Sequence, residues 1–285
     1  MSERKEQNWS LTISSKTNLF DLNLKELWRY KDLIYMFIIR DFASVYKQTI
    51  LGPLWYIIQP MLTTIIYAIV FGGLTKMSTE GQPKILFYMT GILFWSYFSN
   101  NLIKNSDTFL INTGLFGKVY FPRLTVPIAT TISGLLALGF QMILLVVVYL
   151  YYLYQGVDIK IKPSFILFPF LLFLVCMLSM SLGMIIASLT TKYRDLKHLV
   201  TFGVQLALWV TPVLYPLSGV TSPRLLKIIQ LNPLSAVLEA FRYSILGTGA
   251  LHWGALAYSS VFTISTLVVG VVIFNRTEKS FIDTI

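Results

Sequence analysis

Few side chains in this 285-residue chain could take part in acid–base chemistry, and those that could lie far apart. A compact pair of carboxylates is a common basis of general acid–base catalysis, but Asp107, Asp158 and Glu239 are widely separated in the sequence. His198 and His252 lie in or beside predicted loops, where a lone histidine usually has a solvated or interfacial role. The sequence therefore predicts that this chain is not an enzyme.

The sequence also has no pattern for binding a nucleotide or a metal ion. A phosphate-binding loop needs GxxxxGK followed by Ser or Thr, but Gly117-Lys118, the only Gly-Lys dipeptide, is followed by Val119. The single cysteine, Cys176, lies in an apolar block and has no second cysteine with which to form a disulfide or a metal site. We therefore expect no metal and no cofactor in this chain.

The apolar residues carry the strongest signal. Hydrophobic residues make up 55% of the chain and charged residues only 13%, against about 25% charged in a typical soluble domain. The apolar residues gather into six blocks without Asp, Glu, Lys or Arg, each able to supply the ~20 residues of a membrane-spanning helix. The sequence predicts an all-α, polytopic membrane protein with spans at about 53–73, 85–103, 126–154, 163–191, 199–217 and 255–274.

Residues 23–52 are predicted to form an amphipathic helix in the membrane interface, after a cytoplasmic tail of residues 1–22. At 100° per residue, the charged side chains fall on one arc of the helix and apolar side chains on the opposite arc. The charged arc holds Lys25, Arg29, Asp32, Arg40 and Lys47, and the apolar arc holds Leu27, Ile34, Ile38 and Val45. A soluble helix packed on a partner would have the same pattern, so both interpretations stay open.

The positive charge of the chain favours membrane lipids over nucleic acid as the partner. The formal net charge is +10, but the basic residues are dispersed among short loops and termini. A cytoplasmic N-terminus places 16 Lys and Arg inside and seven outside, as the positive-inside rule favours. We therefore expect a multi-pass protein with both termini in the cytoplasm, residues 276–285 forming the C-terminal one.

The predicted loop 104–123 has more pattern than a simple linker. Gly114, Gly117 and Pro122 surround the apolar residues Leu115 and Phe116. This favours a short helix that presents apolar side chains to a protein partner at the cytoplasmic face. The same residues could instead extend the flanking spans.

The fifth apolar block is interrupted by Pro212, Pro216, Pro223 and Pro233. Because proline removes a backbone donor and breaks a helix, we expect a helix that stops early and short helices that dip back into the outer leaflet. The alternative is a standard span that ends at Pro216 and an external loop.

Four segments together resemble the membrane subunit of ABC-2 type exporters for polysaccharides and other lipid-linked glycans. They cover nearly the whole chain and are RDFASVYKQTILGPLWYIIQP (40–60), KVYFPRLTVPIA (118–129), YRDLKHLVTFGVQLALWVTPVLYPL (193–217) and NPLSAVLEAFRYSILG (232–247). Val45 and Gly117 depart from the family, where basic residues are common at these positions. They put in doubt a phosphate-binding role there.

The resemblance implies an ABC-2 type transmembrane domain over residues 53–275 that forms a homodimer in the cytoplasmic (inner) membrane. Two copies of a separate ABC ATPase, which carry the ATP and Mg²⁺, would drive export of a lipid-linked polysaccharide such as an O-antigen, a teichoic acid or a capsule. The alternatives are an ABC-2 exporter of a small lipophilic compound or lipid and a membrane enzyme that modifies glycans.

The resemblance and the residue patterns give three sets of candidate site residues. The coupling loop and interface helix contribute Asp107, Leu115, Phe116, Lys118, Arg40 and Asp41 to the ATPase contact. The outer gate, 211–242, contributes Pro212, Pro216, Asn232 and Pro233. Aromatic rings that could stack on sugars are Tyr88, Trp95, Tyr149, Tyr151 and Tyr152, although Tyr and Trp also gather at membrane interfaces for reasons unrelated to a substrate.

Overall fold

The computed structural model describes residues 24–47, 49–75, 77–193 and 195–281. These residues form helices joined by turns and loops, and they include no β-strand. The all-α fold predicted from the apolar blocks is confirmed. The predicted tail 1–22 and residues 282–285 lie outside the described residues.

The first half of the chain begins with two helices before the first long apolar helix. Gly52–Leu54 is a 3-10 turn that leads into α3, and α3 continues into the π-helix Ala68–Leu74. Pro60 lies inside α3, where it removes a backbone donor. The α-helices are α1 (Leu24–Arg29), α2 (Lys31–Tyr46), α3 (Trp55–Tyr67), α4 (Lys84–Ser106), α5 (Thr108–Ile111) and α6 (Thr113–Phe116).

The second half contains three longer helices and three shorter ones. Two 3-10 turns, Pro163–Leu167 and Leu217–Gly219, precede α8 and α10. Gly247, in the left-handed conformation at φ 73°, ends α11 because glycine adopts that backbone without strain. The α-helices are α7 (Thr125–Tyr154), α8 (Phe168–Thr190), α9 (Leu196–Val210), α10 (Pro223–Leu231), α11 (Pro233–Leu246) and α12 (Trp253–Phe281).

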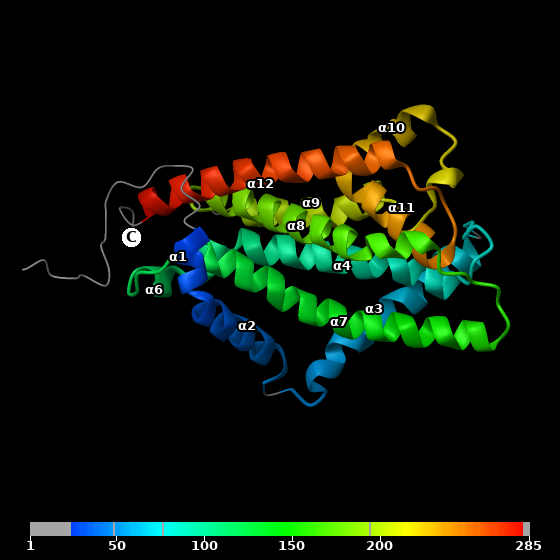
Figure 1. The fold of residues 1–285 in the computed structure, drawn as a ribbon, viewed down its shortest axis with the longest axis horizontal. Helices are drawn as coiled ribbons and strands as arrows, with labels where there is room; N and C mark the ends of the chain where they lie inside the picture. The colour runs from blue at the N-terminus through cyan, green and yellow to red at the C-terminus, as the bar shows by residue number, and fades with distance from the viewer. Residues whose placement is uncertain (1–23, 48, 76, 194, 282–285) are drawn as a thin grey trace, which may run out of the picture.

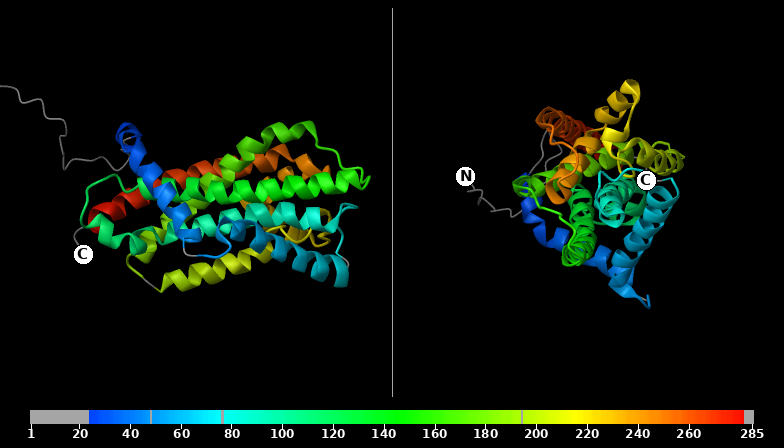
Figure 2. Two further views of the ribbon diagram at one scale, coloured as in Figure 1. Left: turned by 90° about the horizontal axis from the view of Figure 1, so that it is seen from below. Right: turned by 90° about the vertical axis from the view of Figure 1, so that its right-hand side faces the viewer.

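The long helices lie side by side along the longest axis of the molecule (Figure 1), and their two ends carry different short elements (Figure 2). One end carries α1, α6 and the last turns of α12, and we call it the α6 end. The other carries α10 and the connections 77–83 and 155–162, and we call it the α10 end. Successive long helices run in opposite directions between these ends.

Helix α4 lies at the centre of the bundle, in contact with α3, α7, α8, α9 and α11. Because 16 of its 23 residues are buried, α4 is largely surrounded by protein. Two of its asparagines form buried hydrogen bonds: Asn101 Nδ2 donates to Ser179 Oγ of α8 at 2.7 Å, and Asn105 Nδ2 donates to Asn101 Oδ1 at 2.8 Å. The Asn101–Ser179 bond joins α4 to α8, as hydrogen bonds between helices do inside a membrane domain.

Helix length and composition support four of the six predicted spans. Gly52–Leu74, Thr125–Tyr154, Pro163–Thr190 and Trp253–Glu278 are long and apolar enough to cross a membrane. The predicted span 85–103 is α4, which has the length but is made less apolar by its asparagines, serines and tyrosines. The predicted span 199–217 is shortened to α9, whose 15 residues end at Val210 because Thr211, before Pro212, takes an extended backbone with ψ 137°.

Candidate functional site

At the α6 end, an aromatic cluster fixes the short helices α5 and α6 to the bundle. Phe109 stacks on Phe274 of α12 with ring centroids 4.6 Å apart, and Phe116 packs against both Phe109 and Phe121. Phe37 of α2 contacts Phe121 at 5.8 Å. All five rings are buried. The segment between α4 and α7 therefore forms its own anchored helices and does not extend the flanking helices.

Two ion pairs tie neighbouring segments together at the same end. The Lys197 Nζ atom, just inside α9, lies 2.8 Å from Asp107 Oδ2, which is buried between α4 and α5. Arg123 Nη1 donates to the Glu278 carbonyl at 3.0 Å, and the Arg123 guanidinium lies over the Phe116 ring at 5.0 Å. Burial lowers the pKa of Arg123 from its usual value, and the nearby Glu278 carboxylate acts in the opposite direction. The loop before α7 is thereby attached to the end of α12.

Of the loop side chains predicted to make the contact, Lys118 is exposed at this end, whereas Asp107 is buried. Phe116 is buried and Leu115 is half-buried, so both serve the anchored interior. The exposed apolar side chains are those of Ile111, Val119 and Tyr120, which are 70%, 55% and 60% exposed. Together with the exposed Lys118, they form a surface that we call the α6 surface.

Helix α2 places Arg40 and Asp41 near the α6 end without bringing them to the α6 surface. The Arg40 Nη2 atom lies 2.8 Å from Asp41 Oδ1, and the Arg40 guanidinium lies over the Phe37 ring at 4.7 Å. Arg40 is exposed and Asp41 is half-buried on α2, which packs against α7. Helix α2 also leaves Tyr35, Met36 and Ile39 exposed on its free side.

At the α10 end, Arg242 of α11 organises the segment that follows the break in α9. Arg242 Nη1 donates to the carbonyl of Pro212 at 2.6 Å and to that of Tyr215 at 3.3 Å, and Nη2 donates to the carbonyl of Val213. The guanidinium carbon lies 4.1 Å from the centre of the Phe87 ring, and the residue is only 3% exposed. One buried cation thus satisfies backbone acceptors that a continuous helix would have paired internally.

The helical hairpin of α10 and α11 is held at its turn and along its length. Asn232 Oδ1 accepts a hydrogen bond from Leu234 N, which caps α11, and Asn232 Nδ2 donates to Thr211 Oγ1 at 2.8 Å. Pro233 follows as the first residue of α11, its carbonyl accepting from Ser259 Oγ of α12 at 2.8 Å. The predicted gate residue Asn232 is therefore bonded to Thr211, which directly precedes the predicted gate residue Pro212. Pro216 is buried and directly precedes the 3-10 turn Leu217–Gly219.

Gly91 gives a test of how tightly this region is packed. A Cβ atom at this position would lie 2.6 Å from both the Val213 carbonyl oxygen and Arg242 Nη2. We therefore expect Gly91→Ala to displace the Arg242 contacts and lower the melting temperature of the purified protein by several degrees. Gly139→Ala is the matched control, because a Cβ there meets nothing within 4 Å. Equal melting temperatures for the two variants would contradict the tight packing.

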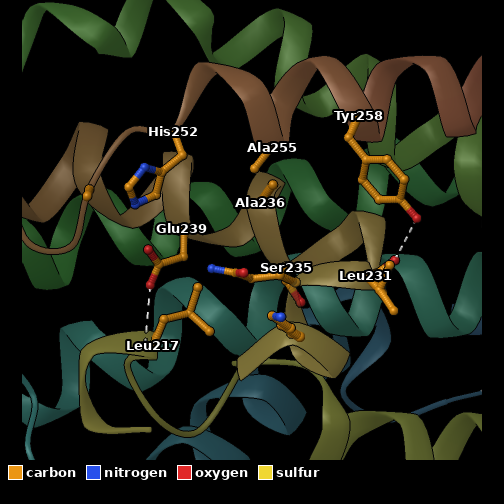
Figure 3. Close-up of a pocket in the computed structure, with 11 residues that line it drawn as sticks. Leu217, Leu231, Ser235, Ala236, Glu239, His252, Ala255 and Tyr258 are labelled. Atoms are coloured by element: carbon orange, nitrogen blue, oxygen red, sulfur yellow. Dashed lines mark hydrogen bonds between the residues drawn. The ribbon is translucent and has the colours of Figure 1, made fainter. Parts of the chain in front are cut away.

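A cavity of about 490 Å³ opens between α10, α11 and α12 (Figure 3). Its charged and polar side chains include Lys227, Glu239 and His252. Glu239 Oε1 accepts a hydrogen bond from Leu217 N at 3.4 Å, and the Tyr258 hydroxyl donates to the Leu231 carbonyl at 3.0 Å. The remaining lining residues are mostly small or apolar.

A second groove, of about 250 Å³, runs between α3, α4 and α7 and is polar for a region within the apolar helices. Its polar side chains come from three helices and present amide, hydroxyl and ammonium groups at one surface. They include Gln59, Thr63, Ser96, Asn100, Lys104 and Gln141. Trp55 and Tyr56 also line the groove, so it combines aromatic faces with hydrogen-bonding groups.

The five aromatic residues predicted to contact sugars do not share one surface. Tyr88 and Trp95 are buried within α4, and Tyr149 is buried with its hydroxyl donating to the Ile159 carbonyl at 3.1 Å. Tyr151 is 55% exposed and Tyr152 is half-buried, with their rings 5.5 Å apart near the end of α7. None of the five lines the polar groove.

The sequence analysis missed Arg242 and gave Glu239 no role. Both are buried in α11, three residues apart, and both bond to backbone atoms of the segment after α9. The sequence did contain a signal for them, namely two charged residues on one side of an otherwise apolar helix. Burying such charges costs free energy, so they usually have a specific partner.

The profile of the ABC-2 type transporter family matches residues 32–246, and the chain belongs to this family. Among its relatives, an O-antigen export system permease protein of Myxococcus xanthus is 27% identical over 224 residues, which cover 77% of this chain and 82% of the relative. An O-antigen export system permease protein of Klebsiella pneumoniae is 25% identical over 251 residues, 88% of this chain and 93% of the relative. A polysialic acid transport protein of Escherichia coli is 19% identical over 245 residues. The protein is therefore a membrane transport protein of this family.

Proposed function

We propose that this chain is the permease subunit of an exporter that moves a lipid-linked polysaccharide out across the cytoplasmic membrane. The observation that carries the proposal is the polar groove between α3, α4 and α7. Its amides, hydroxyls and aromatic faces match the hydroxyl groups and apolar ring faces of sugars. Relatives named for O-antigen export and polysialic acid transport support the same class of cargo.

The permease works as a homodimer with two copies of a separate ABC ATPase bound at the α6 end. The need for a partner follows from the sequence, which has no phosphate-binding loop. The α6 surface suits the contact because it presents Ile111 and Tyr120 on a segment anchored to α2, α7 and α12. A movement of the α5–α6 segment caused by the ATPase would be transmitted to α9 through the Asp107–Lys197 ion pair.

The membrane arrangement consistent with this function has six crossings and both termini in the cytoplasm. Helix α4 crosses with most of its surface covered by neighbouring helices, and α9 makes its crossing with only 15 helical residues. Helices α10 and α11 form a re-entrant gate at the extracytoplasmic end, and α1 and α2 lie in the cytoplasmic interface with their exposed apolar side chains toward lipid.

The location of the polymer in cells tests the proposed function. Deleting the gene is expected to remove the polysaccharide from the cell surface and to leave lipid-linked polymer inside, because synthesis does not depend on the permease. A plasmid copy should restore surface display. Normal polymer display in the deletion strain, or loss of a lipophilic compound from the medium with polymer unchanged, would contradict polysaccharide export.

A groove variant tests whether the polymer passes this surface. We expect Asn100→Leu to slow surface display several-fold, because Asn100 is exposed in the groove and its loss removes hydrogen-bonding capacity without disturbing the core. The matched control is Ile143→Leu on α7, a lipid-facing site outside the groove. Wild-type display by Asn100→Leu at equal membrane abundance would argue against passage along the groove.

A further inference from the structure

The cavity between α10, α11 and α12 changes in polarity from one end to the other. His252 and Glu239 lie at one end of the view in Figure 3, and Tyr258 and Leu231 lie at the opposite end. His252 directly precedes α12, and Tyr258 lies about 8 Å further along that helix at 1.5 Å per residue. The polar end therefore faces the rim of the bundle, and the apolar end lies deeper along α12.

The cavity is lined by charged groups of both signs, and its cations Lys227 and His252 form no ion pair with its carboxylate, Glu239, among the described residues. Lys227 and His252 have no ion-pair partner among the described residues, and the Glu239 carboxylate is 7% exposed. Ser235 also lines the cavity; it is 1% exposed, and its hydroxyl has no hydrogen-bond partner within the described part of the chain. Because buried polar groups are nearly always satisfied, an unpaired hydroxyl at a cavity wall indicates a polar ligand atom beside it.

We propose that this cavity binds one zwitterionic phospholipid whose headgroup carries a primary ammonium, which is phosphatidylethanolamine chemistry. The Glu239 carboxylate receives the ammonium, and Lys227 and His252 donate to the phosphate oxygens. Ser235 donates to an ester or phosphate oxygen, and an acyl chain continues along the apolar end.

The charges in the cavity favour this headgroup over the other common ones. A phosphatidylglycerol headgroup has the same phosphate but ends in a neutral glycerol, so it brings no cation to the Glu239 carboxylate. A choline headgroup has no N–H with which to bond to the carboxylate and is bulkier. A bound lipid would join α10 to α12 at the proposed gate, so its occupancy would stabilise the hairpin. The inference rests on the membrane location of the chain and does not depend on the identity of the cargo.

Native mass spectrometry of the full permease, purified with any bound partner and stripped of lipid, tests the proposal. Phosphatidylethanolamine, phosphatidylglycerol and phosphatidylcholine with identical acyl chains are added in turn. We expect one phosphatidylethanolamine per permease chain, bound at least ten times more tightly than the other two lipids. The double variant Lys227→Gln, His252→Gln should bind it at least ten times more weakly, and Glu239→Gln should lose the preference over phosphatidylcholine.

Arg224→Gln is the control, because Arg224 is exposed on α10 and does not line the cavity. Its lipid affinities should equal those of the wild type. Equal affinity for phosphatidylglycerol, unchanged binding by the double variant, or the absence of saturable binding would overturn the proposal. Melting curves identify any variant that fails to fold, and Ser235→Ala gives a milder second test, with an expected loss of a few-fold in affinity. ATPase recovery and polymer display are measured separately, so failure here is distinguishable from failure of the proposed function.

Discussion

Replacing Tyr120 with aspartate is expected to release the partner ATPase from the permease while the permease stays folded. Tyr120 is 60% exposed on the α6 surface, so the substitution adds a charge to the proposed contact without opening the core. An exposed aromatic residue at the centre of an interface commonly contributes about 2 kcal/mol or more, which corresponds to roughly a 30-fold loss of affinity. Affinity purification of the tagged permease, with quantification of the ATPase that it recovers, measures the effect.

Two further variants make this result specific. Ile111→Asp, at another exposed apolar position of the α6 surface, should have the same effect. Tyr154→Asp is the matched control, since Tyr154 is 92% exposed but lies at the opposite end of α7. Normal ATPase recovery with Tyr120→Asp, or equal losses with Tyr154→Asp, would show that the α6 surface does not hold the ATPase.

Replacing Arg242 with methionine is expected to have the largest effect on stability of any single substitution at the α10 end. The change removes the donor to the carbonyls of Pro212, Val213 and Tyr215. Each buried acceptor left unpaired costs about 1–3 kcal/mol, so the variant should be destabilised by about 3 kcal/mol or more. Thermal unfolding of the purified protein should show a clearly lowered melting temperature, and polymer display should be lost.

A conservative substitution of Arg242 and the substitution of an exposed arginine on α10 provide the controls for this prediction. Arg242→Lys keeps a cation but fewer donors and should lie between methionine and the wild type. Arg224→Met removes an exposed arginine from α10 and should leave the melting temperature within error of the wild type. A wild-type melting temperature for Arg242→Met would mean that these carbonyls do not depend on the guanidinium.

The long apolar helices could be predicted from the sequence because lipid imposes a simple rule on length and composition. The blocks at 53–73, 126–154, 163–191 and 255–274 correspond closely to helices in the structure. The early end of α9 also followed from Pro212, since proline disfavours a helical conformation in the residue before it. These features depend only on local chemistry.

The central position of α4 could not be predicted in this way. Its asparagines look unfavourable for a span when they are considered alone, and they become favourable only because Ser179 and Thr131 face them from other helices. The same holds for Arg242, whose burial depends on a segment about 30 residues earlier in the chain. Pairing between distant segments is a property of the tertiary fold.

The helices of the candidate contact segment could be predicted from the sequence, but the directions of their side chains could not. The segment after α4 does form separate anchored helices, but Phe116 faces the interior and Tyr120 faces outward, a direction that sequence pattern alone does not determine. Among the predicted aromatic residues, Tyr88 and Trp95 of α4 are buried in the hydrophobic core of the helix bundle, where large rings pack efficiently. The polar groove was not predicted, because its members come from three helices.

The entry of energy from a bound partner is tested by the composition and ATPase activity of the permease purified from its native membrane. We expect a second chain that contains a phosphate-binding loop, present in equal amount with the permease, and ATP hydrolysis that disappears when Tyr120→Asp removes this chain. Recovery of the permease without any ATPase chain, from cells whose polymer export is normal, would contradict the claim that energy enters from a partner at the α6 end.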